Sequence, residues 1–234
     1  MTPIIGNAER PSRGIPVVAI ALLGMATILG VWSAGDNVHA LDLRVSTRVQ
    51  QWQGSLPSFL QRIADMSGDT IGAIVALTLL LIIAILVKRP AEIRFVMVVA
   101  CFRVVCMFLK DIFNSPRPTG NLVELLRHYD NTGYPSGHSA TAAMIATALV
   151  ILVFRHTDRK MIRWLVLALA AGFALLVGWS RIWAGAHWPT DVLGGWSYGV
   201  GFTLLASWIV FNDQQQDTTS PDRATPPITS AADR

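Results

Sequence analysis

Long apolar runs alternate with short polar connections along most of this chain. Six of the runs approach or reach the roughly 20 residues that a helix needs to cross the apolar core of a bilayer. We expect these helices at residues 15–34, 70–87, 93–113, 139–154, 164–179 and 192–211. The pattern therefore predicts an all-α fold, a polytopic membrane helix bundle with six transmembrane helices. A secretory signal is a competing interpretation of the first run, but its apolar core would be unusually long, so a retained helix is favoured.

The segments outside the runs complete the predicted organisation. Residues 1–14 are polar, and residues 212–234 are rich in Asp, Gln, Thr, Ser and Pro, a composition typical of disorder. We expect a polar cytoplasmic N-terminus, one membrane domain over residues 15–211 and a disordered cytoplasmic tail. Within the domain, residues 35–69 carry apolar side chains at roughly helical spacing. This spacing favours an amphipathic helix at the outer interface, although a solvated loop fits the pattern equally well.

Composition and charge agree with a membrane protein and give its orientation. The chain is 52% hydrophobic and 15% charged, which is far from the composition of soluble domains. Its net charge of +4 includes no basic run with interleaved aromatics, so nucleic-acid binding is not expected. Cations in short connections mark the cytoplasmic side, and they cluster on one side of the six-helix arrangement, at Arg10, Arg13, Lys88, Arg89, Arg94, Arg155, Arg159, Lys160 and Arg163. Both termini are then cytoplasmic, and the loops 114–137 and 181–190 lie on the outer face.

The stretch from Ser180 to Asp191 concentrates ionisable residues between two apolar runs. His187 and Asp191 stand four residues apart, and Pro189 is well suited to the first turn of a helix. One helical turn would bring the carboxylate to a ring N–H, which would fix the tautomer and leave the other nitrogen's lone pair available. Arg181 adds a permanent planar cation suited to a phosphoryl group. Taken alone, a His and an Asp at this spacing more often form a local hydrogen bond than a catalytic pair.

Two further stretches end at the same predicted face. The stretch from Lys110 to Pro118 ends a predicted helix and contains two prolines, and it carries the cations Lys110 and Arg117. The second stretch, Ser136-Gly137-His138, stands at the start of the fourth predicted helix. A helix N-terminus presents unpaired N–H groups and partial positive charge, which favour phosphate. Gly137 lets the backbone approach an oxyanion, Ser136 can cap the helix or donate its hydroxyl, and His138 can protonate a leaving group. This set of groups suits phosphoryl transfer, since positioning and charge stabilisation supply most of the catalysis. Arg103, in mid-helix, is interpreted as structural or as a support for the site residues, without a chemical role of its own.

Together these residues resemble a known three-part signature. Its parts are Lys110 followed after six residues by Arg117-Pro118, then Pro135-Ser136-Gly137-His138, and then Ser180-Arg181, five residues, His187, three residues and Asp191. Their order and spacing resemble the type 2 phosphatidic acid phosphatase superfamily, and they cover residues 110–191. A triple match at these spacings is strong, whereas any one part would be weak.

The resemblance implies a metal-independent phosphatase without a cofactor. By the same resemblance, His187 is the nucleophile, Asp191 orients it, and His138 protonates the leaving group before water hydrolyses the phosphohistidine. Lys110, Arg117, Arg181 and the amides around Ser136 and Gly137 hold the phosphate oxygens. The segments 35–69 and 119–133 fall outside the signature, and we expect substrate choice to depend on them.

The sequence thus predicts an integral-membrane lipid phosphatase, in a bacterial inner (plasma) membrane, with its site toward the outer or periplasmic side. The expected substrates are lipid phosphomonoesters or diphosphates, of the undecaprenyl diphosphate, phosphatidylglycerophosphate, phosphatidic acid or lipid A phosphate type. A lipid phosphotransferase with the same site is the main alternative, while a vanadate haloperoxidase or a transporter fits less well. Besides its substrate and membrane lipids no partner is predicted, and the oligomeric state is not determined by these patterns.

Overall fold

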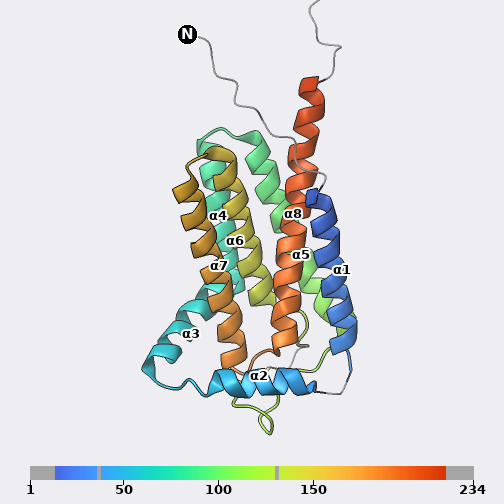
Figure 1. Cartoon of the computed structure of the whole chain (residues 1–234), viewed down its shortest axis with the longest axis vertical. Helices are drawn as coiled ribbons and strands as arrows, with labels where there is room; N and C mark the ends of the chain where they lie inside the picture. The colour runs from blue at the N-terminus through green and yellow to red at the C-terminus, as the bar shows by residue number, and fades with distance from the viewer. Residues whose placement is uncertain (1–13, 36–37, 130–131, 220–234) are drawn as a thin grey trace, which may run out of the picture.

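The computed structural model describes residues 14–35, 38–129 and 132–219, with side chains to residue 212, and it is all-α as predicted. Its eight helices run in chain order (Figure 1): α1 (Gly14–Ser33), α2 (Ala40–Gln50), α3 (Ser55–Gly68), α4 (Thr70–Leu86), α5 (Pro90–Phe113), α6 (Gly137–His156), α7 (Lys160–Trp183) and α8 (Pro189–Thr219). Six of them, α1 and α4 to α8, coincide with the six predicted runs. The predicted N-terminal segment before residue 14 lies outside the described residues.

Fewer helices than six qualify as spans by length and composition. Four are long and apolar enough to cross a membrane: α1, α6, α7 and the Pro189–Asn212 part of α8. The pair α3 and α4, bent by 60°, makes a fifth if it is counted as one broken span. Helix α5 is long enough but carries five charged residues, Glu92, Arg94, Arg103, Lys110 and Asp111. The protein is therefore a membrane helix bundle with four or five candidate spans, and the six-span arrangement stays a prediction.

The segment 35–69 forms two helices, so the solvated-loop interpretation is wrong. Helix α2 lies across one end of the bundle, and α3 leads from it back to the start of α4 (Figure 1). Helix α3 is amphipathic, because it buries Pro57, Gln61, Ala64 and Gly68. Its apolar side chains Leu56, Phe59, Ile63 and Met66 are exposed. An exposed apolar face of this kind suits lipid, and its place at the interface remains a prediction.

The end of α8 differs from the prediction. The helix continues to Thr219, so the first part of the segment predicted to be disordered is helical. No glycine or proline interrupts the chain between Asn212 and Pro221, which explains why the helix can extend beyond its apolar part. Residues 220–234 lie outside the described part of the chain.

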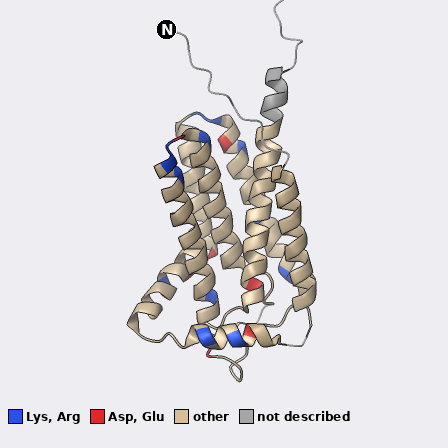
Figure 2. Ribbon diagram, viewed as in Figure 1, with Lys and Arg blue, Asp and Glu red and all other residues tan. Residues whose placement is uncertain are grey.

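Basic side chains are found near both ends of the bundle (Figure 2). One group lies at the end where α4 joins α5 and α6 joins α7, and it includes Lys88, Arg89, Arg155 and Lys160. A smaller group lies on α2 at the opposite end. Arg10 and Arg13, also used for the predicted orientation, are outside the described residues. The orientation of the bundle in the membrane therefore remains a prediction.

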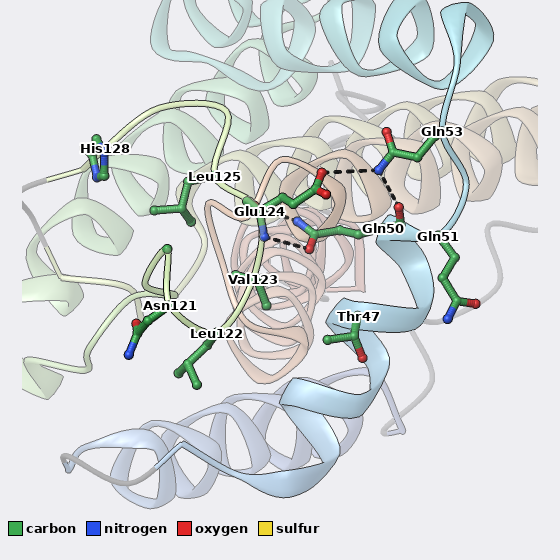
Figure 3. A pocket seen from close by; sticks show the side chains of 11 residues that line it. Thr47, Gln50, Gln51, Gln53, Asn121, Leu122, Val123, Glu124, Leu125 and His128 are labelled. Carbon is green, nitrogen blue, oxygen red and sulfur yellow. Dashed lines mark hydrogen bonds between the residues drawn. The ribbon is translucent and has the colours of Figure 1, made fainter.

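Helix α2 is tied to the loop that follows α5. The amide of Gln50 donates to the carbonyls of Glu124 at 2.7 Å and Trp183 at 3.1 Å, and its oxygen accepts from the Glu124 N–H at 3.1 Å. Gln53 adds a hydrogen bond to the Glu124 carboxylate at 3.3 Å (Figure 3). These groups border a surface cavity of about 700 Å³. The contacts fix the loop 119–129 over the end of the bundle.

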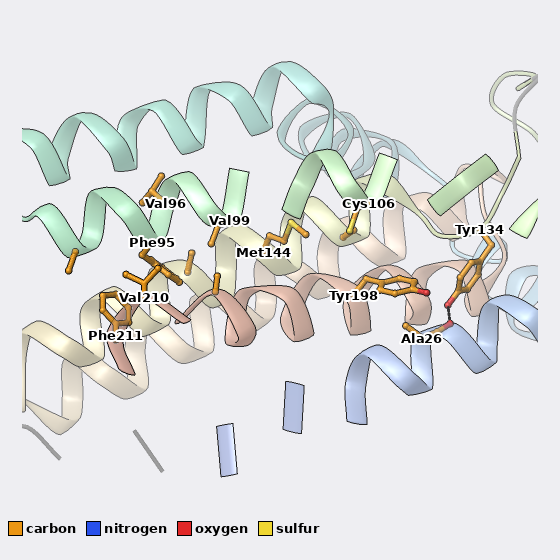
Figure 4. Packing of buried hydrophobic residues seen from close by; sticks show 14 of the residues in the cluster. Ala26, Phe95, Val96, Val99, Cys106, Tyr134, Met144, Tyr198, Val210 and Phe211 are labelled. Atoms are coloured by element: carbon orange, nitrogen blue, oxygen red, sulfur yellow. Dashed lines mark hydrogen bonds between the residues drawn. The ribbon is translucent and has the colours of Figure 1, made fainter. Parts of the chain in front are cut away.

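The core lies between α1, α5, α6 and α8. Phe95, Val99, Met144 and Tyr198 are buried there with their neighbours (Figure 4). Toward the α2 end, the buried hydroxyl of Tyr134 donates to the Ala26 carbonyl. Cys101 and Cys106 are both free thiols.

Two glycines of α8 bring its backbone against that of α6. A Cβ at Gly195 would lie 2.6 Å from the Ser136 carbonyl, and one at Gly199 would lie 2.5 Å from the Ala140 carbonyl. Both distances are too short for a side chain of any kind, so only glycine permits this approach. We call this contact the α6–α8 seam. It holds the N-terminal ends of the two helices next to each other.

Candidate active site

His187 lies in a tight turn between α7 and α8. The turn passes through Gly185, whose φ of +65° favours glycine. The N–H groups of Ala186 and His187 both donate to the Arg181 carbonyl, at 3.0 and 3.2 Å. Helix α8 then begins at Pro189, as the sequence predicted. This turn delivers His187 to the end of the bundle where α6 also begins.

His187 and Asp191 form a buried pair. His187 Nδ1 lies 3.2 Å from Asp191 Oδ2, and the same oxygen accepts the Trp188 N–H at 3.0 Å. Asp191 has no exposed surface and His187 is 3% exposed. With Nδ1 facing the carboxylate, Nε2 carries the available lone pair when the ring is neutral. Arg117 Nη1 lies 3.2 Å from that Nε2, so a cation already faces the reactive nitrogen.

The surroundings of His187 favour its neutral form. Burial is the largest cause that holds its pKa well below the usual range, and the neighbouring cations Arg117, Lys110 and Arg181 lower the pKa further. Both effects disfavour an imidazolium in the free site. The ring is therefore neutral at neutral pH.

One cavity of about 300 Å³ brings together most of the residues that the sequence singled out. Its wall includes Lys110, Arg117, Gly137, His138, Arg181 and His187. Asp191 lies behind His187, and Ser136 is fully buried outside the cavity wall. Arg103 also reaches the wall and donates to the Thr141 hydroxyl at 2.5 Å. Three separate stretches thus converge on one electropositive space.

The three cations that the resemblance assigns to phosphate lie on different elements, with Lys110 on α5, Arg117 in the loop after it and Arg181 at the end of α7. Lys110, in the last turn of α5, lies 3.5 Å from the Thr132 carbonyl. Arg117 donates to the Ala186 carbonyl, and its guanidinium stacks over the ring of Tyr129 at 4.5 Å from the centroid. Burial is the largest cause that lowers the pKa of Arg117, but an arginine stays charged near neutral pH. Fixed cations of this kind can hold phosphate oxygens without moving far.

Ser136 differs in part from its predicted use. Its hydroxyl caps α6 by accepting the Ser139 N–H at 3.4 Å, as the sequence suggested. Its own N–H donates to the Asp191 carbonyl at 3.0 Å and is therefore engaged. The amides of Gly137 and His138 follow it, in the first turn, where N–H groups have no intrahelical partners. They are the better candidates for contact with an anion.

Three residues with clear contacts in the site were not identified from the sequence. Asp65, on α3, accepts from Arg181 Nη1 and lies 3.3 Å from His138 Nε2. The Tyr129 hydroxyl accepts from Arg181 Nη2 at 2.8 Å. Asp42, on α2, accepts from both the N–H and the hydroxyl of Thr190, at 3.0 and 2.7 Å, in the first turn of α8. An acidic residue inside an amphipathic apolar segment was the only available signal for Asp65.

The loop between α5 and α6 carries two further basic residues, Arg127 and His128. Arg127 is exposed, donates to the Tyr129 hydroxyl at 2.8 Å and lies 3.7 Å from Asp65 Oδ2. His128 is exposed at the border of the 700 Å³ cavity. Asp130 lies outside the described residues. Arg127 thus belongs to a charged cluster around Asp65 and is not an isolated loop cation.

The fold is an integral-membrane helix bundle, and it encloses an electropositive cavity beside a buried histidine–carboxylate pair. The model of the PAP2 superfamily matches residues 91–215, more than half of the 234 residues, so the chain belongs to this superfamily. Among the described residues, no group of three or more His, Cys, Asp or Glu side chains is placed to hold a metal ion.

Similar proteins support the same family. The chain is 36% identical over 109 residues to an undecaprenyl-diphosphatase of Sulfolobus acidocaldarius, which covers 47% of this chain and 44% of that protein. It is 38% identical over 80 residues to phosphatidylglycerophosphatase B of Bacillus subtilis, covering 32% and 37%. The matches thus span less than half the length of these relatives.

Two solved structures have the same fold. A transmembrane PAP2 type phosphatidylglycerolphosphate phosphatase from Bacillus subtilis superimposes with a TM-score of 0.69 at 22% identity, covering 88% of this chain and 98% of that one. LpxE of Aquifex aeolicus gives a TM-score of 0.56 at 27% identity, covering 72% and 95%.

Proposed function

We propose that this protein is a metal-independent phosphatase that hydrolyses a lipid phosphomonoester or diphosphate through a phosphohistidine. The observation that carries the proposal is the position of His187, whose Nδ1 faces Asp191 while the ring borders a cavity walled by Lys110, Arg117 and Arg181. A neutral imidazole among fixed cations can attack phosphorus, whose oxygens would otherwise repel a nucleophile.

The proposed reaction has two steps. In the first, His187 Nε2 attacks phosphorus while the bond to the leaving oxygen breaks and His138 gives that oxygen a proton. Asp191 stabilises the positive charge that forms on His187. In the second, water attacks phosphorus and gives a proton to neutral His138, and the P–N bond breaks to restore neutral His187. Lys110, Arg117, Arg181 and the first amides of α6 hold the phosphate oxygens in both steps.

A lipid substrate is supported by where the cavity lies. Besides the polar groups its wall includes Met107 of α5, which is 50% exposed on the side of the bundle, and Thr70 at the start of α4. A headgroup in the cavity therefore has a short route for its tail to the apolar surface of the bundle. The undecaprenyl-diphosphatase and phosphatidylglycerophosphatase relatives support the class of substrate.

We further propose six spans with both termini cytoplasmic and the site on the outer side, in a bacterial inner membrane.

The test is phosphate release by purified protein from a panel of lipid phosphates and diphosphates in detergent, with EDTA present. We expect release by the wild type and none by His187→Ala. His156→Ala is a matched control, because His156 also pairs with a carboxylate, Glu92 at 3.2 Å, far from the cavity and near the other end of the bundle. Near-normal release by His187→Ala would exclude this histidine as nucleophile. Transfer of label to an added lipid without free phosphate would instead identify a phosphotransferase.

A further inference from the structure

Asp65 joins the two parts of the site that the family signature leaves unconnected. It lies on α3, outside the 110–191 region, and its Oδ1 contacts both Arg181 Nη1 and His138 Nε2. Arg181 comes from the end of α7, and His138 comes from the first turn of α6. A single carboxylate oxygen thus sets the position of a cation and a histidine on two different helices.

The remaining contacts of Arg181 leave one of its donors for a ligand. Its side chain is 1% exposed, Nη1 is bonded to Asp65, and Nη2 is bonded to the Tyr129 hydroxyl at 2.8 Å. Its Nε is buried without a hydrogen-bond partner, although the residue borders the cavity. A buried donor without a partner is costly, and a phosphate oxygen in the cavity is the acceptor that would satisfy it.

His138 also has a buried nitrogen without a hydrogen-bond partner. Its Nε2 lies 3.3 Å from Asp65 Oδ1 but outside hydrogen-bonding geometry. A small adjustment of the ring would complete this bond and leave Nδ1 for the leaving group. Asp65 also compensates the cations around His138, since a nearby carboxylate favours the imidazolium that a general acid must be. The other charged or titratable groups facing His138 or sharing its cavity are Asp69, Arg103, Cys106, Lys110, Arg117, Tyr129, Arg181 and His187.

Asp65 itself is outside the wall of the 300 Å³ cavity. It therefore stands behind the two groups that it contacts and does not occupy the place of the substrate. Helix α3 reaches this position because Gly68 packs closely on α6 and α7: a Cβ there would lie 2.9 Å from Val177 Cγ1 and 3.0 Å from His138 Cδ2.

We propose that Asp65 is a positioning residue for the reaction, which holds His138 as the proton donor and Arg181 as the phosphate ligand. The inference rests on the proposed phosphatase function. In the first step the P–O bond to the leaving group breaks and a proton moves from His138 Nδ1 to the leaving oxygen. Asp65 remains ionised throughout and stabilises the charged form of His138 before the transfer.

The experiment compares two substrates in each preparation, a short-chain phosphatidic acid and p-nitrophenyl phosphate. The alkoxide leaving from phosphatidic acid needs a proton, whereas nitrophenolate leaves without one. For Asp65→Asn we expect kcat on phosphatidic acid to fall by about 10- to 100-fold, within the usual contribution of general acid catalysis. The fall on p-nitrophenyl phosphate should be less than about fivefold, because only the acid step distinguishes the two substrates. KM should rise for both, since Arg181 then faces a neutral amide oxygen where it had an ionised partner.

Two further readouts separate positioning from a purely structural role. With phosphatidic acid, the alkaline limb of the pH–rate profile of Asp65→Asn should move to lower pH, because His138 loses its proton more easily without the carboxylate. Asp65→Glu should recover part of the rate. Asp111→Asn makes the same change at an exposed site on α5 and should behave as wild type.

The outcomes decide between the possibilities. Equal losses of kcat on both substrates, including complete loss, would overturn the proposal. The ratio of the two kcat values in one preparation does not depend on the fraction of protein that is folded. Asp65→Asn behaving like Asp111→Asn would also overturn it. A higher rate in Asp65→Asn would show that the carboxylate competes with phosphate instead. If the wild type hydrolyses neither of these substrates nor any lipid phosphate or diphosphate of the panel, it is the proposed function that fails; if it hydrolyses another lipid of the panel, that lipid replaces phosphatidic acid in the comparison.

Discussion

The carboxylate of Asp191 is the part of the site whose effect can be worked out most directly. The change Asp191→Asn keeps the size of the side chain and removes its charge. The amide oxygen can still accept from the Trp188 N–H and from His187 Nδ1, which now lie 3.0 and 3.2 Å from Oδ2. The variant therefore tests the charge with little change in geometry.

The expected loss follows from Coulomb's law. In the proposed intermediate His187 is cationic, and a unit charge at the 3.2 Å separating Nδ1 and Oδ2 interacts by about 5 kcal/mol at an effective dielectric constant of about 20. At about 1.4 kcal/mol for each factor of ten, this corresponds to a loss in kcat of roughly 10³- to 10⁴-fold. Because Asp191 is fully buried, added salt should not reduce the effect much.

The assay is phosphate release from a lipid phosphate in detergent, for the wild type, Asp191→Asn and Asp158→Asn. Asp158 is fully exposed in the α6–α7 connection and serves as the control for the same chemical change. Comparable unfolding midpoints would show that Asp191→Asn is folded. A kcat within tenfold of the wild type would refute the reasoning, because the buried charge would then not be needed to stabilise the intermediate.

Two other predictions concern pH and stability. Burial and neighbouring cations lower the pKa of His187, so the proposed nucleophile stays neutral below the ordinary histidine pKa of about 6.5. The acid limb of the pH profile of kcat/KM should therefore lie below pH 6.5. An acid limb at or above that pH would contradict the prediction. Asp42→Ala removes the acceptor of the Thr190 N–H and hydroxyl, which are buried. It should lower the free energy of unfolding, measured by denaturant titration in detergent, by about 1–3 kcal/mol. An unchanged free energy of unfolding would show that these two groups find another partner.

Local patterns in the sequence were enough to predict much of the site. The apolar runs predicted the six long helices, because burial in lipid demands continuous apolar surface. The pair His187 and Asp191 is one helical turn apart, so its contact needed only the start of α8. The gathering of Lys110, Arg117 and Arg181 around it followed from the resemblance, and the structure places these residues on one cavity wall.

The contributions of α2 and α3 could not be predicted in this way. Asp65 meets Arg181 across 116 positions of sequence, and Asp42 meets Thr190 across 148. No local period encodes such contacts, because they depend on how α2 crosses the end of the bundle and how α3 turns back at Gly68. The number of spans could not be settled from the apolar runs either, since the five charged residues of α5 make it less apolar than a lipid-facing helix.

The α6–α8 seam bears on how this protein can change over evolutionary time. The starts of α6 and α8 carry His138 and Asp191, and their separation is set by backbone against backbone at Gly195 and Gly199. A side chain at either position would push the two helices apart, so we expect both positions to require glycine. On the outer face of α7, Met161 and Trp164 are 81% and 69% exposed and do not line the cavity. Side chains on this face can therefore change to suit the surrounding lipids. The lipid-facing surface of the bundle can thus change with the composition of the membrane while the spacing of His138 and Asp191 stays the same.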